Sequence, residues 1–258
     1  MATIRCGGHT FPSIEAVLFD KDGTLADVEG YLQQLGYDRV HKLCDRSNGP
    51  LLDNGAFLLS AFGLVDGKLD PAGLLAVGSR QENEVAAAAC LAADGWPWIA
   101  ALTAAKAAFC EAERSLAPKA KKTPLIAGAA ALIARLKDLQ LKVGIVSADL
   151  HREVEAFITH HELSRIDWVW GAGDGHMPKT HPEFLRFACC EVGGEQPVAP
   201  QSVLVIGDSA SDLGVAEQGA AGFVAMMGGW STSPTIDVEG AECAIAPISH
   251  LDQVEVFA

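Results

Sequence analysis

Three short apolar runs, each ending in a polar side chain, constrain the fold of this chain more than any other feature. Continuous apolar runs of this length are typical of strands that are buried on both faces of a parallel sheet. The runs are AVLFD at residues 16–20, KVGIVS at 142–147 and SVLVIGD at 202–208. Weaker runs, at residues 167–170, 222–225 and 243–245, are further candidate strands. We therefore expect a parallel sheet with polar residues at the carboxyl ends of its strands.

Segments of helical character separate these runs. Residues 129–139 repeat Leu and Ile at the spacing of an amphipathic helix. Residues 212–219 have a helical composition and end in a glycine, as many helices do. Strands that alternate with helices predict an α/β fold with a doubly wound, Rossmann-like parallel sheet.

Residues 27–118 follow a different pattern. They hold no convincing β run, and their Ala- and Leu-rich stretches at 83–93 and 98–116 favour helices. We therefore expect a helical domain inserted between the first and second strands, at residues 27–118. The α/β core domain would then comprise residues 1–26 and 119–258. For residues 1–13 the sequence indicates nothing beyond one additional candidate strand.

The charge of the chain bears on its partners. The 258 residues carry a formal net charge of -14. Nucleic acids and anionic membrane surfaces attract proteins rich in Lys and Arg, so we expect neither as a partner. A phosphorylated substrate would have to be attracted by a local site. Screening over roughly 8 Å at physiological salt permits this.

Cysteine content and hydropathy bear on the compartment. The seven cysteines form no CxxC pair, and an odd number fits neither a disulfide framework nor a zinc site. We expect most of them to be small buried apolar groups in a reducing compartment. The sequence begins without a secretory signal and has no apolar run of about 18 residues. These features predict a cytoplasmic protein.

Polar side chains occur at or just after the ends of separate candidate strands. In an open α/β sheet, ligands bind outside the carboxyl ends of the strands, so these residues can meet at one site. Several carboxylates at one site cannot all stay ionised without a compensating cation, and Mg²⁺ prefers oxygen ligands of this kind. The residues are Asp20 and Asp22 in DKDGT, Ser147, Lys179, and Asp208 and Asp212 in GDSASD.

These motifs resemble, in order and spacing, the four motifs of the haloacid dehalogenase (HAD) superfamily of hydrolases. DKDGTL at residues 20–25 resembles the first motif, and VGIVS at 143–147 resembles the second. Lys179 corresponds to the third motif and GDSASD at 207–212 to the fourth. The helical insert lies where the family places its C1-type cap. The segment PLIAG at 124–128 is similar to phosphoglycolate-phosphatase-like members.

The resemblance implies a role for each acid in the first motif. Asp20 would be the nucleophile that forms an aspartyl-phosphate, and its second oxygen would bind Mg²⁺. Asp22 would protonate the leaving alkoxide and then activate the water that hydrolyses the intermediate. The backbone carbonyl of Asp22 would also bind the metal.

The resemblance also implies how the remaining residues act. Thr24 would orient Asp22 and take part in substrate binding, and Ser147 would donate a hydrogen bond to a phosphoryl oxygen. Lys179 would neutralise charge on the phosphate and on Asp20. Asp208 would be a direct metal ligand, and Asp212 a ligand or the partner of one. The chain departs from the family pattern at Ala148-Asp149, where many relatives carry Asn and often Lys.

The function implied is a magnesium-dependent phosphatase that acts on a small phosphorylated metabolite, with phosphoglycolate as the first candidate. A phosphomutase of the β-phosphoglucomutase type shares all four motifs, although its first motif commonly has DGV in place of DGT. A binding or regulatory protein that retains the fold is the alternative from a different class. Such a protein should have lost the nucleophile, the acid or a metal ligand, and none of these residue types is missing here. The motifs make no prediction of oligomeric state.

Overall fold

The computed structural model describes residues 1–46, 55–173, 177–232, 236 and 241–258. These residues separate into two units. One comprises Met1–Asp27 and Thr123–Ala258, and the other comprises Val28–Lys122. The first unit carries all of the motif residues, and each unit is described separately below.

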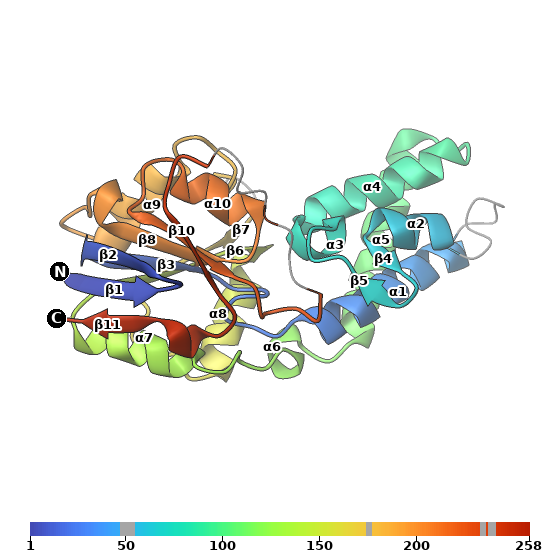
Figure 1. Ribbon diagram of the computed structural model, residues 1–258. Helices are drawn as coiled ribbons and strands as arrows, with labels where there is room; N and C mark the ends of the chain where they lie inside the picture. The colour runs from blue at the N-terminus through green and yellow to red at the C-terminus, as the bar shows by residue number, and fades with distance from the viewer. Residues whose placement is uncertain (47–54, 174–176, 233–235, 237–240) are drawn as a thin grey trace. The chain divides into compact units, whose positions relative to one another are not determined.

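The larger unit is built on a six-stranded sheet with the order β10-β9-β8-β3-β6-β7 (Figure 1). Every neighbouring pair of strands is parallel. The strands are β3 (Ala16–Asp20), β6 (Lys142–Leu150), β7 (Trp168–Ala172), β8 (Val203–Gly207), β9 (Gly222–Met226) and β10 (Ile245–Ile248). All six predicted strands are present. The last of them begins at Ile245, where the sequence pattern placed its end.

The strand order brings the motifs together. From the central strand β3 the chain runs outward through β6 and β7, and it then returns to β8 on the other side of β3. This reversal is a topological switch point, where the loops after neighbouring strands diverge and leave room for a ligand. The second motif therefore lies in β6, and the first and fourth motifs begin at the ends of the next two strands in the order, β3 and β8.

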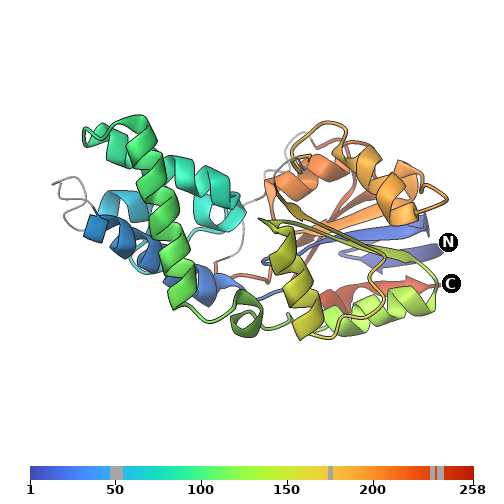
Figure 2. The ribbon, with the colours of Figure 1, turned by 180° about the vertical axis from the view of Figure 1, so that it is seen from behind.

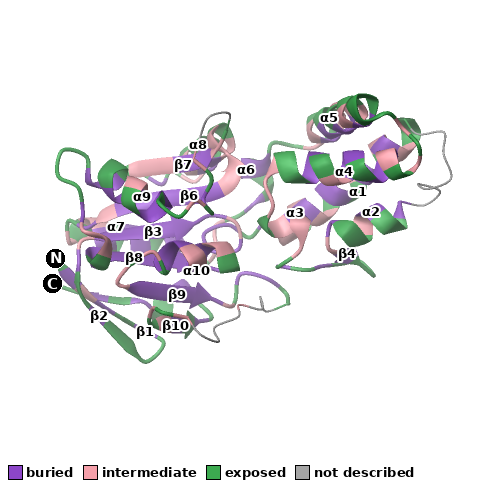
Figure 3. Cartoon of the chain, turned by 90° about the horizontal axis from the view of Figure 1, so that it is seen from above, coloured by how far each residue is buried: buried purple, intermediate pink, exposed green. Residues whose placement is uncertain are grey.

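Helices cover both faces of this sheet, as Figures 1 and 2 show. Helices α9 (Phe184–Gly193) and α10 (Ala210–Ala216) lie on one face, and α7 (Ala129–Asp138) and α8 (His151–His160) lie on the other. The strands β3, β8 and β9 between these layers are buried along their whole length (Figure 3). The predicted α/β fold with a doubly wound parallel sheet is confirmed.

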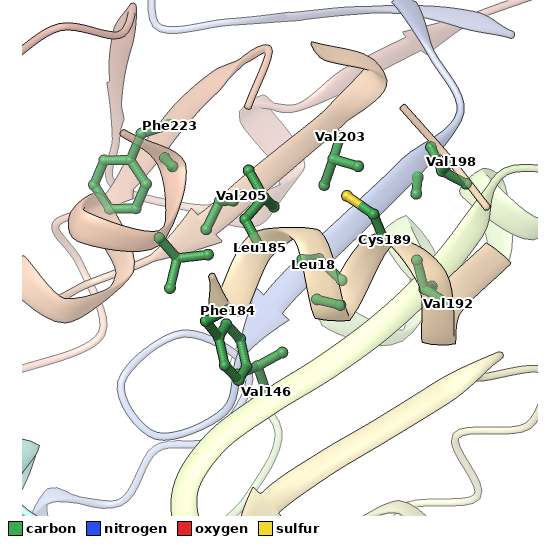
Figure 4. Packing of buried hydrophobic residues seen from close by; sticks show 14 of the residues in the cluster. Leu18, Val146, Phe184, Leu185, Cys189, Val192, Val198, Val203, Val205 and Phe223 are labelled. Carbon is green, nitrogen blue, oxygen red and sulfur yellow. The ribbon is translucent and has the colours of Figure 1, made fainter. Parts of the chain in front are cut away.

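One hydrophobic cluster joins the sheet to α9 and α10 (Figure 4). Leu18 of β3 and Val205 of β8 contribute to it, and Phe184 of α9 is fully buried in it. The ring of Phe184 meets that of Trp170 edge to face, with 5.0 Å between the ring centroids. Because this cluster sits directly behind β3 and β8, it fixes the strands from which the site residues project.

The two ends of the chain form a second sheet that the sequence pattern did not indicate. Its order is β11-β1-β2, with β1 (Ala2–Cys6), β2 (His9–Ile14) and β11 (Glu255–Phe257) all antiparallel. Two strands thus lie in the N-terminal segment, for which the sequence indicated only a possible additional strand. Phe11 of β2 contacts Gly222, and a side chain at position 222 would come within 2.4 Å of its ring.

The smaller unit is mainly helical. Its helices are α1 (Glu29–Arg46), α2 (Ala56–Ala61), α3 (Leu74–Val77), α4 (Arg80–Ala93), α5 (Trp98–Ser115) and α6 (Lys119–Lys122). It also contains a short antiparallel hairpin, β4 (Leu64–Val65) with β5 (Lys68–Leu69). The expectation of no β structure in this segment was wrong on this point, because two-residue strands leave no periodic signal.

Ion pairs join the three long helices of the smaller unit. The Glu113 carboxylate of α5 lies 3.2 Å from Arg39 of α1 and 3.1 Å from Arg80 of α4. The guanidinium of Arg39 is buried over the ring of Phe109. Removal of one partner would leave a buried charge uncompensated, so this network holds the three helices in register.

Two general expectations can be compared with the structure. Within the described residues, no helix is both long enough and apolar enough to cross a bilayer. All seven cysteines are free, but only Cys6, Cys90 and Cys189 are buried. The expectation that most of them are buried was wrong, since Cys110 and Cys190 lie on exposed helix faces and two others are partly exposed.

Replacement of Phe184 tests the packing of the main cluster. We expect Phe184→Ala to lower the free energy of unfolding by about 3–5 kcal/mol, because it removes a fully buried ring and leaves a cavity. Phe57→Ala is the matched control, because that ring is 66% exposed and its loss should change stability by less than about 0.5 kcal/mol. Urea denaturation followed by circular dichroism measures both. Equal effects would contradict the placement of Phe184.

Candidate active site

Three carboxylates gather at the carboxyl ends of β3 and β8. Asp20 is the last residue of β3, Asp208 directly follows β8, and Asp212 lies in the first turn of α10. Their carboxylate oxygens lie within 4.8 Å of one another. Asp208 and Asp212 are buried, and Asp20 is 9% exposed. An oxygen-rich, anionic cluster of this size suits a hard divalent cation such as Mg²⁺.

The fourth member of the cluster is a lysine from a different loop. The Nζ of Lys179 lies 2.7 Å from Oδ1 of Asp20 and also contacts Oδ1 of Asp212. Lys179 is buried and lies in the segment between β7 and α9. The sequence prediction that Asp20, Lys179 and Asp208 converge is therefore matched by the geometry.

The proton affinities of these groups reflect their burial and mutual proximity. Burial raises the pKa of Asp20 well above its usual range, and Asp212 and Asp208 add to this, while Lys179 opposes it. Burial also raises the pKa of Asp208 to about 7, again with a contribution from Asp212. For Lys179, burial lowers the pKa, but the carboxylates of Asp20 and Asp212 outweigh this and raise it. Lys179 therefore stays positively charged. Its single charge is too little to keep the pKa values of Asp20 and Asp208 in their usual range.

Asp212 is fixed by the start of its own helix. The hydroxyl of Ser209 caps the backbone N–H of Asp212, and the Asp212 carboxylate accepts the backbone N–H of Ser209 at 3.0 Å. This reciprocal capping box leaves the other carboxylate oxygen directed at Lys179. The SASD sequence therefore serves both helix initiation and the site.

The turn after β3 depends on a glycine. Gly23 has φ of +81°, and a Cβ atom there would come within 2.4 Å of Oδ2 of Asp208. Only glycine permits this close approach without strain. The next residue, Thr24, is fully buried and its hydroxyl donates to Oδ1 of Asp208 at 3.0 Å. Thr24 was predicted to orient Asp22, but this hydrogen bond makes it a partner of Asp208.

Trp230 is a site residue that the sequence interpretation missed. It lies in the loop after β9, it is buried, and its indole N–H donates to Oδ2 of Asp208 at 2.6 Å. The loop can reach Asp208 because Gly229 packs against the backbone of Gly23, where any side chain would collide with the carbonyl oxygen. Both oxygens of Asp208 are thus hydrogen-bonded. The glycine pair before Trp230, a few residues after a predicted strand, was the available signal.

Asp22 and Ser147 lie beside this cluster. The side chain of Asp22 is 15% exposed and contacts the ammonium of Lys21. Ser147 is buried in β6 directly after Val146, which is paired with Asp20 in the sheet. Its Oγ accepts the backbone N–H of Asp149 at 3.1 Å, which leaves the hydroxyl hydrogen free to be donated.

The family model described as haloacid dehalogenase-like hydrolase matches residues 14–219, which includes all of the motif residues. The chain belongs to this family. It is therefore a HAD-like hydrolase. No curated protein sequence matches the chain.

Solved structures share the fold over almost the whole chain. A haloacid dehalogenase-like hydrolase of Bacteroides fragilis has 20% identity and a TM-score of 0.62, covering 93% of this chain and 99% of its own. A protein named as a predicted phosphoglycolate phosphatase from Haemophilus somnus 129pt has 17% identity and a TM-score of 0.61, covering 93% and 95%. A Thermotoga maritima protein named as a β-phosphoglucomutase has 15% identity and a TM-score of 0.59, covering 93% and 96%. At these identities the likeness concerns the fold alone.

The raised pKa of Asp208 predicts a pH-dependent stability. Its folded-state pKa of about 7 lies above the ordinary value of 3.8, so the folded protein holds this proton more tightly than the unfolded chain does. The resulting stabilisation is present at low pH and is lost as the pH rises through about 7. In EDTA, we expect the free energy of unfolding of the wild type to fall between pH 5 and 8 by about a few kcal/mol more than that of Asp208→Asn. Urea denaturation measures the free energy of unfolding of both proteins at each pH. If it changed equally with pH in the wild type and in Asp208→Asn, the pKa of Asp208 would not be raised.

Proposed function

We propose that this HAD-like hydrolase is a magnesium-dependent phosphomonoesterase that forms an aspartyl-phosphate on Asp20. The observation that supports this best is the contact of the buried Lys179 ammonium with Asp20 inside the carboxylate cluster. A carboxylate can attack a phosphate only if positive charge offsets the repulsion between the two anions. Lys179 supplies one such charge at the attacking residue itself.

The donor set fits a divalent cation. Asp20, Asp208 and Asp212 bring three carboxylates to the site. Among the residues that the structure describes, Lys179 is the one cation within hydrogen-bonding distance of them. The raised pKa values of Asp20 and Asp208 show that more positive charge is needed to keep these groups ionised. Mg²⁺ held by the carboxylates of Asp20, Asp208 and Asp212 would supply that charge and polarise a bound phosphoryl oxygen.

Each residue of the chain then has a defined task. One oxygen of Asp20 attacks phosphorus, while the proton on Asp22 passes to the leaving oxygen as the P–O bond breaks. Asp22, now a base, takes a proton from the water that attacks the phosphorus of the aspartyl-phosphate, and inorganic phosphate and the Asp20 carboxylate are regenerated. Lys179 and the Ser147 hydroxyl bind phosphoryl oxygens throughout. Thr24 and Trp230 hold Asp208 in place.

The substrate we propose is a small soluble phosphate ester, and phosphoglycolate is the first compound to test. The likeness to a protein named as a predicted phosphoglycolate phosphatase motivates that choice. A phosphomutase would use the same first step but pass the phosphoryl group to a second hydroxyl of a sugar phosphate. Release of inorganic phosphate with water as acceptor distinguishes a phosphatase from a phosphomutase.

Two further assignments belong to the same proposal. We propose that the helical unit Val28–Lys122 is the cap that selects the leaving group, with the α/β unit as the catalytic core. The insert expected from the sequence comprises residues 27–118, and the compact helical unit comprises Val28–Lys122. We also propose a cytoplasmic location, with which seven free cysteines agree.

Replacement of the nucleophile tests the proposal directly. We expect the wild type to hydrolyse p-nitrophenyl phosphate with Mg²⁺ and to lose activity in EDTA. Asp20→Asn should lower kcat by about 10⁵-fold, because the amide cannot form the acyl-phosphate. Asp138→Asn is the matched control, since Asp138 lies in the last turn of α7 with its side chain 61% exposed. Full activity of Asp20→Asn would exclude the aspartyl-phosphate route.

Trp230 offers a test that does not depend on turnover. Trp230→Phe keeps the aromatic ring but removes the N–H that orients Asp208. Loss of a hydrogen-bonding partner of a metal ligand typically weakens metal binding about 10–100-fold. We therefore expect Trp230→Phe to raise the Kd for Mg²⁺ about tenfold or more, as measured by isothermal titration calorimetry. Trp98→Phe, at an exposed position of the helical unit, is the control. An unchanged Kd would show that the hydrogen bond from Trp230 does not support metal binding.

A further inference from the structure

Lys21 is a buried cation to which the proposed mechanism gives no task. It lies between the nucleophile Asp20 and the acid Asp22, yet its side chain is only 1% exposed. Burial of an isolated ammonium is strongly unfavourable, so a buried lysine persists only where partners compensate its charge. Its placement therefore has to be explained by what its ammonium contacts.

Three groups surround the Lys21 ammonium. It contacts Oδ1 of Asp22, and it lies 3.0 Å from Oδ2 of Asp149. Its Nζ also lies 5.4 Å from the centroid of the Phe157 ring, within range of a cation–π contact. Phe157 comes from α8 and is buried, so it forms a fixed apolar wall behind the charge.

These contacts connect two motif loops. Asp149 lies near the end of β6, and its backbone N–H donates to the Oγ of Ser147. Lys21 thus ties the turn after β3 to the segment that carries Ser147. Asp22 and Asp149 are 15% and 23% exposed, so the buried ammonium anchors two carboxylates that are still partly accessible.

We propose that Lys21 is a positioning residue for Asp22, held in place by Asp149 and Phe157. This inference rests on the proposed phosphatase function and deepens it. The ammonium confines the Asp22 carboxylate to the orientation in which its second oxygen can reach the leaving oxygen. Asp149 balances the charge, so that Lys21 can remain between the two loops without a net buried cation.

Leaving-group dependence distinguishes positioning from a purely structural role. Transfer of a proton to the leaving oxygen matters most when that oxygen is strongly basic. Phenyl phosphate and p-nitrophenyl phosphate have nearly the same shape, but phenolate is a much stronger base than nitrophenolate. A misplaced Asp22 therefore slows hydrolysis of phenyl phosphate more, whereas a general loss of structure slows both substrates equally.

The experiment compares kcat/KM for the two substrates in Lys21→Met, which removes the charge at similar volume. We expect a loss of about 10²-fold for phenyl phosphate, the magnitude that misplacement of a catalytic group can cause. For p-nitrophenyl phosphate we expect a loss of less than about fivefold, since its leaving group needs little protonation. Asp22→Asn should show the same selectivity and serves as the benchmark.

Lys137→Met is the matched control. Lys137 is also a largely buried lysine in an ion pair, with Asp167, but that pair lies at the amino end of β6, away from the site. We expect Lys137→Met to lower kcat/KM only slightly, and by the same factor for both substrates. Equal losses for both substrates in Lys21→Met, or no loss, would overturn the inference while the phosphatase function stands. Absence of Asp20-dependent hydrolysis in the wild type would overturn both.

A second variant covers the case in which Lys21→Met does not fold, as judged by circular dichroism and gel filtration. Asp149→Asn is nearly isosteric and affects a partly exposed side chain, so the fold should be retained. It removes one anchor of Lys21, and we expect a loss of about tenfold that is again confined to phenyl phosphate. A loss shared by both substrates would contradict the positioning role.

Discussion

The site depends on the balance between three buried carboxylates and one buried ammonium. Asp20, Asp208 and Asp212 are brought within 4.8 Å of one another at the ends of two adjacent strands. Such a cluster opposes folding, because burial and mutual repulsion both disfavour the ionised forms. Lys179 offsets part of this cost by contacting two of the three carboxylates. We propose that a divalent cation compensates the remaining imbalance and would help to bind a phosphate.

The surrounding structure fixes the orientation of these charged groups before any ligand arrives. Thr24 and Trp230 each donate to a different oxygen of Asp208. Ser209 holds Asp212 through the capping box of α10. Behind them, the apolar cluster of the sheet with α9 and α10 immobilises the strands. Hydrogen bonds that are formed during folding need no reorganisation during the reaction, and this favours electrostatic catalysis.

The distribution of charge also bears on how so acidic a protein could bind the anionic substrate that we propose. The net charge of -14 repels a phosphate at long range, but screening limits that repulsion to short distances. At the site, Lys179 is joined by a second buried lysine, Lys21, whose charge is shared between Asp22 and Asp149. Two ammonium groups thus lie beside the residues that we propose to touch the phosphate and the leaving group, and each is paired with carboxylates.

The sequence by itself determined the α/β class, the six parallel strands and the residue types that gather at their ends. These properties follow from local patterns, because a buried strand needs a continuous apolar run and a tight turn needs a residue such as Gly23. The fold of the chain ends was missed, since the short strands of residues 2–14 and 255–257 are stabilised by pairing with each other rather than by their own pattern.

Only the tertiary structure decided which side chains touch. Thr24 and Asp208 are separated by 184 residues and share a hydrogen bond, and that bond replaced the predicted contact of Thr24 with Asp22. Trp230 reaches Asp208 because two glycine-containing loops pack backbone to backbone, and Lys21 meets Asp149 because β3 and β6 are neighbours in the sheet. Contacts of this kind depend on the packing of segments that are distant in the chain. A local pattern can place each residue at the site, but it cannot say which atom faces which.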